Sequence, residues 1–270
     1  MPELPEVETT RRGIVPFAEG EIIESVVIRE PRLRWPVDAG LPGKLTGQRI
    51  RTIGRRGKYL LFETAPGTAL VHLGMSGSLR VVDAATALKK HDHFDFTLAN
   101  GKTLRFHDPR RFGSLLWAED ASRHPLLRDL GPEPLDDEFS GAYLRATARG
   151  RRVAVKSFVM NSQVVVGVGN IYASEALFRA GIHPRRSAGR ISAARYQRLA
   201  AAIKAVLNDA IKLGGTTLRD YYSGEGAPGY FRQELDVYER ASGPCHRCGR
   251  PIKRVVIGQR ATYYCGHCQH

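Results

Sequence analysis

Residues 245–268 read CHRCGRPIKRVVIGQRATYYCGHC, and this stretch decides the fold at the end of the chain. Two residues separate Cys245 from Cys248, two separate Cys265 from Cys268, and sixteen lie between the pairs. Two such knuckles are typical of a tetrahedral zinc site with four thiolate ligands and no open position, which is a structural site. We therefore predict that these four cysteines bind one structural Zn2+.

The residues between the cysteine pairs have the pattern of a β-hairpin. Arg254–Ile257 and Ala261–Tyr264 read as two strands joined around Gly258, Gln259 and Arg260. Zinc would pin this hairpin and hold Arg260 at its tip. Disulfide bonding is the disfavoured alternative, because cysteines clustered in this way in a reducing compartment indicate a metal.

Upstream of the zinc module, the chain has the pattern of a helical domain. Gly131-Pro-Glu-Pro reads as a linker into it. The clearest helix is predicted from an N-cap at Ser192 to a stop at Gly214-Gly215, and a shorter one over Ile171–Ala180. A loop rich in glycine and tyrosine, at about 217–231, follows. The long helix is expected to bury a stripe of Leu199, Ile203, Val206, Leu207 and Ala210.

The N-terminal half reads mostly as short strands, rich in Val, Ile, Leu and Phe and broken by Gly, Pro, Asn and Asp. One helix from Glu6 to about Ala18 precedes them. This spacing predicts a sandwich or barrel. The predicted strands are Glu21–Arg29, Ile50–Ile53, Tyr59–Thr64, Ala69–Leu73, Ser78–Val82, Phe94–Leu98, Thr103–His107 and Ser114–Trp117.

The charge of the chain indicates its class of partner. Its 270 residues include 41 Lys+Arg and 27 Asp+Glu, a formal net charge of +14. This excess favours nucleic acid first and an anionic membrane surface second, with a merely soluble basic protein as the alternative. No apolar stretch approaches the ~20 residues of a membrane span, and the start MPELPEVE is no signal peptide. We expect a cytoplasmic protein.

Three clusters of basic residues occur, one in each predicted domain. Any single cluster is usually a solvated face, but three together favour a continuous phosphate-binding surface. The first is Arg49, Arg51, Arg55, Arg56 and Lys58, and the second is Arg145, Arg149, Arg151, Arg152 and Lys156. The third comprises the six Lys and Arg residues from position 236 onward, where there are two acids.

The residue after the initiator methionine is Pro2. Methionine is commonly removed ahead of a small residue, and removal here would expose a secondary amine. A secondary amine that attacks a sugar C1′ forms an iminium ion with no N–H to lose. That cation acidifies the C2′ proton and makes elimination of the phosphate feasible, so Pro2 is a candidate for covalent catalysis.

Motifs along the whole chain, taken in order, resemble those of the bacterial formamidopyrimidine-DNA glycosylase family. They are MPELPEVE (1–8), GKYL (57–60), HLGMSGSL (72–79), KHDH (90–93), DPRRFG (108–113), VGVGNIYA (166–173), PGYF (228–231) and the four cysteines. The resemblance implies a multidomain α+β fold with DNA in a cleft. The implied parts are an N-terminal β-sandwich with its helix (1–132), a helix–two-turn–helix domain with a lesion-capping loop (133–230) and a zinc finger (236–270).

The resemblance also implies a bifunctional glycosylase and lyase of base excision repair. It would remove 8-oxoguanine and formamidopyrimidines from double-stranded DNA, act on abasic sites, and nick the strand by β- and δ-elimination. It would work as a monomer without an obligatory protein partner. Which atoms distinguish 8-oxoguanine from guanine does not follow from the sequence, although backbone groups of the 217–231 loop are suspected.

Individual roles carry over to matching positions as implications of the resemblance. Pro2 is then the nucleophile, Glu3 the acid/base at the sugar, Lys58 the proton donor for β-elimination and Arg260 the one for δ-elimination. Met75, Arg110 and Phe112 would fill the gap left by the extruded nucleotide. The implied DNA contacts are His91, Arg110, Arg152, Lys156 and Asn170. Arg152 departs from the lysine frequent in the family, and a guanidinium fork is not equivalent to an ammonium.

Other interpretations remain open at this point. An endonuclease VIII-like glycosylase for oxidised pyrimidines would share the proline, the zinc finger and the fold, although Leu4, Arg110 and Phe112 favour the formamidopyrimidine type. A non-enzymatic, zinc-stabilised DNA-binding protein would need no free Pro2. His91 and His93 could form a metal pair, although no third ligand is evident in the sequence.

Overall fold

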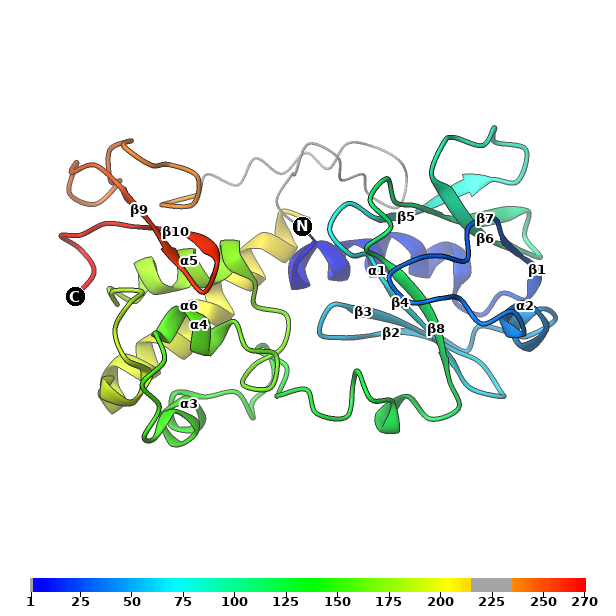
Figure 1. Ribbon diagram of the computed structural model, residues 1–270. Coiled ribbons are helices and arrows are strands. Elements are labelled where there is room, and N and C mark those ends of the chain that lie inside the picture. Colours follow the sequence, from blue (N-terminus) through cyan, green and yellow to red (C-terminus); the bar gives the residue numbers. More distant parts are fainter. Residues whose placement is uncertain (1, 215–234) are drawn as a thin grey trace. The chain divides into compact units, whose positions relative to one another are not determined.

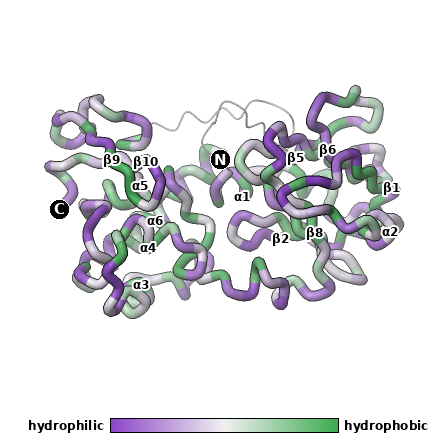
Figure 2. Tube along the Cα trace, viewed as in Figure 1, coloured by the Kyte–Doolittle hydropathy of each residue, from purple (hydrophilic) through white to green (hydrophobic). Residues whose placement is uncertain are grey.

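The computed structural model describes residues 2–214 and 235–270. The described residues fall into two compact units, one of residues 2–128 with 213–214 and one of residues 129–212 with 235–270. Each unit has its own hydrophobic core, and Figure 2 shows apolar segments in both. The 217–231 loop expected from the sequence lies outside the described residues. No helix in the described ranges has the length and apolar character to cross a membrane.

The first unit is one long helix and two antiparallel sheets, as Figure 1 shows. One sheet has the strand order β1-β6-β7-β5 and the other β2-β3-β4-β8. The elements are α1 (Leu4–Ala18), β1 (Ile23–Ile28), α2 (Leu41–Leu45), β2 (Thr52–Arg56), β3 (Tyr59–Glu63), β4 (Thr68–His72), β5 (Ser78–Asp83), β6 (Asp92–Leu98), β7 (Lys102–His107), β8 (Ser114–Ala118) and the 3-10 turn η1 (Ala121–Arg123).

The core of the first unit contains residues of both sheets, together with Val7 and Ile14 of α1. Phe94 of β6 and Phe106 of β7 stack in it with ring centroids 4.7 Å apart. The N-terminal β-sandwich with its helix, expected from the sequence, is confirmed. The helix begins at Leu4 rather than Glu6, because Pro5 is well suited to a first turn and Glu3 caps it.

The second unit is built on the long helix α6 (Ala193–Lys212), against which α3 (Gly141–Ala148) and α5 (Asn170–Arg179) pack. The predicted stripe of α6, from Leu199 to Ala210, is buried. Two short helices were not predicted, α3 and α4 (Val155–Val159), since each has too few turns for a periodic apolar pattern. The other elements are η2 (Ala188–Arg190), β9 (Lys253–Ile257) and β10 (Arg260–Tyr264).

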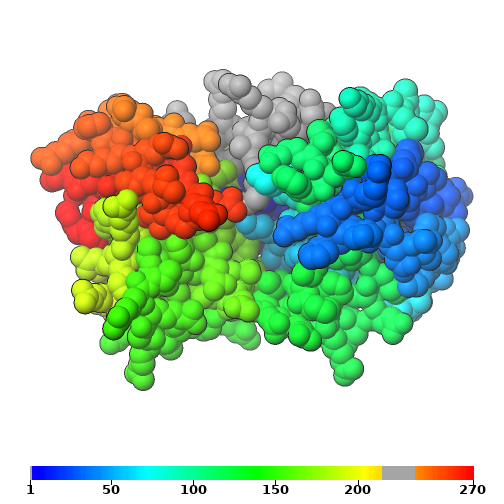
Figure 3. Space-filling model, viewed as in Figure 1, coloured from blue at the N-terminus to red at the C-terminus, as the bar shows by residue number. Residues whose placement is uncertain are grey.

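The cysteine module packs on helix α5 within the second unit. Figure 3 shows the residues of the module, in orange and red, against those of the helical part, in green and yellow. Phe178 of α5 shares a small apolar cluster with Val237, Ile252 and two of the cysteines. The buried carboxylate of Glu175 accepts hydrogen bonds from the backbone N–H groups of Asp236, Val237 and Tyr238 at 2.8–3.0 Å. These contacts fix the start of the module on α5.

A buried carboxylate joins α1 to strand β2 in the first unit. Glu8 accepts hydrogen bonds from Arg11, Arg12 and Arg55 at 2.9–3.1 Å. Although burial opposes ionisation, these hydrogen bonds and the charges of Arg11 and Arg55 lower the pKa of Glu8 to about 2. Arg55 also donates to the carbonyl of Gly57 at 3.0 Å, in the turn that follows β2. The helix and this turn are therefore held through one carboxylate.

We predict that Glu8→Gln lowers the stability of the first unit and flattens its dependence on acid. Because the folded pKa is depressed, the stabilisation by Glu8 is complete above the ordinary carboxyl pKa of 4.5 and is lost as the pH falls towards about 2. At neutral pH the contribution is up to about 3 kcal/mol. Urea unfolding between pH 7 and pH 2 measures it. The control is Glu24→Gln, at an exposed position of β1; parallel curves for Glu8→Gln and the wild type would contradict the prediction.

Candidate functional site

Pro2 and Glu3 directly precede the first turn of α1, and both are buried. Glu3 is the N-cap residue of a capping box, in which its side chain accepts from the backbone N–H of Glu6. The Glu6 carboxylate in turn accepts from the Glu3 N–H at 2.7 Å. A capping box fixes the path of the chain as it enters the helix. The nitrogen of Pro2 and the carboxylate of Glu3 thus start from a rigid backbone.

Lys58 lies in the two-residue turn between β2 and β3, where Arg56 pairs with Tyr59. Gly57 adopts a positive φ of 57°, which this tight turn requires and glycine permits. The Arg55 guanidinium holds the Gly57 carbonyl and also the Glu8 carboxylate of α1. The helix that follows Pro2 and the turn that bears Lys58 therefore share one hydrogen-bond network.

His72, at the end of β4, has a neutral imidazole at physiological pH. Burial, together with the positive charges of Lys58 and Arg34, lowers its pKa to about 4. Its Nδ1 accepts a hydrogen bond from the Gly74 N–H at 2.9 Å, so the proton of the neutral ring is on Nε2. His72 thereby fixes the turn that continues into Met75, a role that the sequence did not reveal.

Met75, Arg110 and Phe112 lie on two loops that approach each other closely. Gly74 has φ +68°, and a Cβ there would come within 2.4 Å of Phe112 backbone carbon and of Gly113 nitrogen. The Arg110 guanidinium lies 4.8 Å from the centre of the Phe112 ring, a cation–π contact. Phe112 is 42% exposed, so part of its ring remains accessible beside the Arg110 guanidinium.

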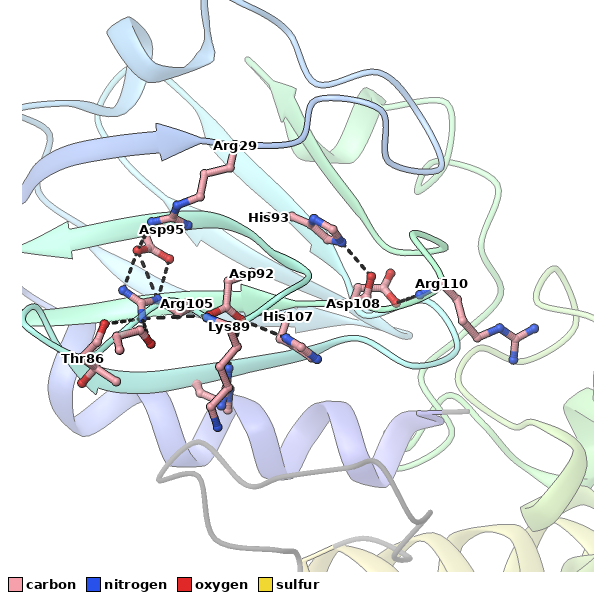
Figure 4. Close-up of polar contacts among 12 residues, drawn as sticks. Arg29, Thr86, Lys89, Asp92, His93, Asp95, Arg105, His107, Asp108 and Arg110 are labelled. Atoms are coloured by element: carbon pink, nitrogen blue, oxygen red, sulfur yellow. Dashed lines mark hydrogen bonds and ion pairs between the residues drawn. The ribbon is translucent and has the colours of Figure 1, made fainter.

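Asp108 fastens these two loops together and is itself fully buried. Its Oδ1 accepts from the Ser76 hydroxyl at 2.6 Å and from the Arg110 N–H at 3.2 Å. Its Oδ2 accepts from the Gly113 N–H at 2.8 Å. In Figure 4 the Arg110 guanidinium points away from Asp108, while the backbone of Arg110 is bonded to it. Asp108 was not singled out from the sequence, because nothing local marks a carboxylate that binds a second loop.

His91 is attached to the same loop through the backbone. The Asp108 N–H donates to the His91 carbonyl at 3.0 Å, and His93 Nε2 lies 2.7 Å from the Asp108 carbonyl. His91 has φ +76°, a strained conformation for a residue with a side chain. His93 Nε2 is thus engaged by the loop. Within the described ranges, only the four cysteines form a group of three or more potential ligands placed to hold a metal.

In the second unit, Lys156 and Asn170 contact the hairpin of the cysteine module. Lys156 is 1% exposed, and its ammonium donates to Asn170 Oδ1 at 2.6 Å, to Thr262 Oγ1 at 2.8 Å and to the Ala261 carbonyl at 3.2 Å. Asn170 Nδ2 donates to the same carbonyl at 3.0 Å. These bonds fix the strand that begins at Arg260, whereas Arg152 is exposed in the loop after α3.

The four cysteine sulfurs lie within 4.8 Å of one another. The Cys248–Cys265 and Cys245–Cys268 sulfurs are 3.5 and 3.9 Å apart, too far for a disulfide. Tetrahedral Zn–S bonds of ~2.3 Å place sulfurs about 3.8 Å apart, so the thiols fit zinc. Strands β9 and β10 pair from Arg260 with Ile257 to Tyr264 with Lys253, which gives the predicted hairpin.

These features define a class: a zinc-finger protein with a β-sandwich unit and a helical unit. Residues 1–115 match the formamidopyrimidine-DNA glycosylase N-terminal domain, and residues 130–222 match the H2TH domain of the same family. Residues 242–270 match the zinc finger found in FPG and IleRS. The four-cysteine zinc site predicted from the sequence is confirmed, as is the overall fold class.

Full-length relatives identify the family. A formamidopyrimidine-DNA glycosylase of Stenotrophomonas maltophilia is 60% identical over 269 residues, 100% of each chain. The crystal structure of a Lactococcus lactis FPG mutant in complex with Fapy-dG-containing DNA has a TM-score of 0.91 at 34% identity, covering 100% of both chains. A structure of MutM with DNA containing carbocyclic 8-oxo-G gives 0.90 at 34% identity, again over 100% of both. The chain belongs to the formamidopyrimidine-DNA glycosylase family.

We predict that Asp108→Asn loosens the loop that carries Arg110 and Phe112. An amide can accept at one position only, so its NH2 group would face either the Gly113 N–H or the two donors at Oδ1. Hydrogen–deuterium exchange of the Arg110 or the Gly113 amide, whichever then faces the NH2 group, should accelerate by about tenfold, as expected for the loss of a buried hydrogen bond. The control is Asp83→Asn on β5, whose side chain is 73% exposed. Unchanged protection in Asp108→Asn would contradict the role given to this carboxylate.

We predict that Cys248→Ser abolishes stoichiometric zinc binding and loosens the packing of the cysteine module against α5. The module has a small core and depends on its metal, since zinc binding supplies the folding free energy of such sites. Zinc content by mass spectrometry and limited proteolysis after residue 235 give the two readouts. His246→Ala, in the same knuckle but not a ligand, should keep both properties of the wild type. Full zinc occupancy in Cys248→Ser would overturn the assignment.

Proposed function

We propose that the protein is a bifunctional DNA glycosylase and lyase that acts from the nitrogen of Pro2. The observation that carries this proposal is the rigid start of α1. Pro2 and Glu3 are buried at a capped helix N-terminus, and the same helix is tied through Glu8 and Arg55 to the turn of Lys58. A non-catalytic DNA-binding protein has no need for an amine, a carboxylate and an ammonium held in this way.

In the proposed reaction, the Pro2 nitrogen attacks C1′ of the damaged nucleotide and the base leaves with the electrons of the glycosidic bond. Glu3 acts as the acid/base at the sugar. The Pro2 nitrogen then loses its proton and the C1′–O4′ bond breaks, its electrons going to O4′, which is protonated, so that an iminium ion forms between the nitrogen and C1′. This cation draws electrons from C2′, which loses a proton, and the 3′ phosphate leaves by β-elimination. Lys58 is the proposed proton donor for this step, and Arg260 the one for δ-elimination of the 5′ phosphate. Covalent catalysis divides one difficult step into easier ones.

The proposed substrate is double-stranded DNA with an oxidised purine or an abasic site. Relatives of the family have been crystallised with DNA containing Fapy-dG and an 8-oxo-G analogue. Extruding a nucleotide costs a few kcal/mol and leaves a gap in the stack. We propose that Met75 and Phe112 fill it with apolar surface, as inserted wedges do, and that Arg110 hydrogen-bonds the orphaned base. Asp108 then positions this wedge without touching DNA.

The remaining proposed DNA contacts are of two kinds. Arg152 is exposed at the surface, and His91 is half-buried in a strained turn. We propose phosphate contacts for both. Lys156 and Asn170 have their polar atoms engaged with the hairpin, so any phosphate contact by them goes together with positioning Arg260. The zinc ion is structural. We further propose a monomer in the bacterial cytoplasm, without an obligatory protein partner.

We predict that borohydride traps the protein covalently on duplex DNA with 8-oxoguanine opposite cytosine. Trapping requires the free secondary amine of Pro2, so a protein that retains Met1 or bears an N-terminal tag should lose trapping and strand cleavage but keep DNA binding. The matched control bears the same tag at its C-terminus. Full cleavage by the N-terminally blocked protein would exclude the proline mechanism. Excision of oxidised pyrimidines in preference to 8-oxoguanine would favour the endonuclease VIII-like alternative.

A further inference from the structure

A broad part of the second unit carries positive charge with almost no acid. Between Phe139 and Asn208, the only Asp or Glu is Glu175. That carboxylate is buried and bound to three backbone N–H groups of the cysteine module. The basic residues of the same stretch are therefore not neutralised by acids of their own segment. Five of them belong to one surface, which we call the arginine platform: Arg151, Arg152, Arg185, Arg186 and Arg190.

The arginine platform stands on two chain segments that are hydrogen-bonded to each other. The Val155 N–H donates to the Arg186 carbonyl at 2.8 Å, and the Ala188 N–H donates to the Val153 carbonyl at 2.9 Å. The Gly189 N–H then donates to the Arg151 carbonyl at 2.8 Å. This ladder holds the Arg151–Arg152 backbone beside the backbone that bears the other three arginines.

Close packing adds to the rigidity of this ladder. A Cβ at Gly189 would lie 2.9 Å from the Arg151 carbonyl oxygen, so only glycine allows the two segments to come so near. The Ser187 hydroxyl also donates to that carbonyl, at 3.1 Å. The backbone that bears these guanidinium groups is already ordered, so little backbone entropy is lost when they bind a ligand.

Two hollows run along the arginine platform and share Ser187 and Arg190. One, of about 390 Å³, is lined by Arg151, Arg152 and Arg190 together with glycines and the serine. The other, of about 570 Å³, is lined by Arg185, Arg186, Arg190, His183, His270 and the serine. All five arginines are exposed, and in the described part of the chain none of them forms an ion pair with an acid.

We propose that the arginine platform binds the phosphate backbone of the DNA duplex outside the damaged site. Arginine presents a planar fork of donors that matches phosphate oxygens, and a row of such forks suits a repeating polyanion. An acidic peptide is the less suitable ligand, because neither hollow offers an apolar side chain in which a peptide could anchor. The inference rests on the proposed function, and it extends the DNA contact of Arg152 to four further arginines.

The test compares Arg185→Glu/Arg190→Glu with Arg123→Glu/Arg198→Glu. Both double variants change the net charge equally, and Arg123 and Arg198 are exposed arginines outside the platform. Affinity is measured by fluorescence anisotropy over a range of salt, on duplexes of about 12 and about 30 base pairs that carry a central abasic-site analogue. Excision from the short 8-oxoguanine duplex at saturating protein is the activity readout.

We expect Arg185→Glu/Arg190→Glu to bind the long duplex at least about tenfold more weakly. The plot of log affinity against log salt should become less steep, with the magnitude of its negative slope smaller by about two. The variant's affinity for the short duplex and its excision rate should stay within about twofold of the wild type. The control variant should change both duplexes alike and by less. Arg185→Gln/Arg190→Gln should change the salt slope by at least about half as much as Arg185→Glu/Arg190→Glu does, since glutamine removes the charge without adding repulsion.

Equal weakening on both duplex lengths, or an equal effect in the control variant, would overturn the proposal. So would unchanged DNA affinity accompanied by weaker binding of a polyglutamate peptide, which would identify an acidic peptide as the ligand. Failure of the proposed function gives a different result: the wild type would then not cleave the 8-oxoguanine duplex. The salt slope on undamaged DNA of about 30 base pairs would still report on the platform in that case.

Discussion

The proposed chemistry depends most on the contact between the buried, ionised carboxylate of Glu8 and the arginines around it in the first unit. A buried charge is tolerated only where hydrogen bonds and opposite charges replace water, and three guanidinium groups do so here. One of them, Arg55, continues to the carbonyl of Gly57. The helix that follows the proposed nucleophile and the turn that bears the proposed proton donor are therefore linked by one electrostatic network, in addition to the packing of Val7 and Ile14 in the core.

Buried carboxylates hold two other parts of the molecule, the loop of Arg110 and Phe112 and the start of the cysteine module. Asp108 binds two loop N–H groups and a hydroxyl, and Glu175 binds three successive N–H groups of the cysteine module. Loops cannot be fixed by apolar burial alone, because their backbone groups need partners. A buried acceptor with two oxygens satisfies several donors at once. Acidic side chains thus act as internal fasteners, while the surface is left strongly basic.

The parts of the molecule whose signal is local could be predicted from the sequence. The spacing of the cysteines, the periodicity of α6 and the alternation of short strands each lie within one segment, so they predicted zinc, a helix and a sandwich correctly. The start of α1 was placed two residues late, because a glutamate N-cap is less recognisable than serine or aspartate. The roles of Asp108 and Glu8 could not be predicted, since each depends on a partner distant in the chain. The role of His72 depends on burial of its ring at the end of β4, which the local sequence does not show. The proposed roles of Pro2, Glu3 and Lys58 stay predictions drawn from a family resemblance.

The ammonium of Lys156 has a consequence for how this protein can evolve. Its partners, Asn170 and Thr262, come from a helix and from the cysteine hairpin, and it is almost completely buried. Removal of one partner of a buried charge commonly costs about 3–5 kcal/mol, whereas replacement of the whole set by apolar groups can be neutral. Single substitutions at these three positions are therefore disfavoured, whereas a joint replacement can keep the stability but not the bonds that position Arg260. The three positions should change together over evolutionary time, as a single inherited character.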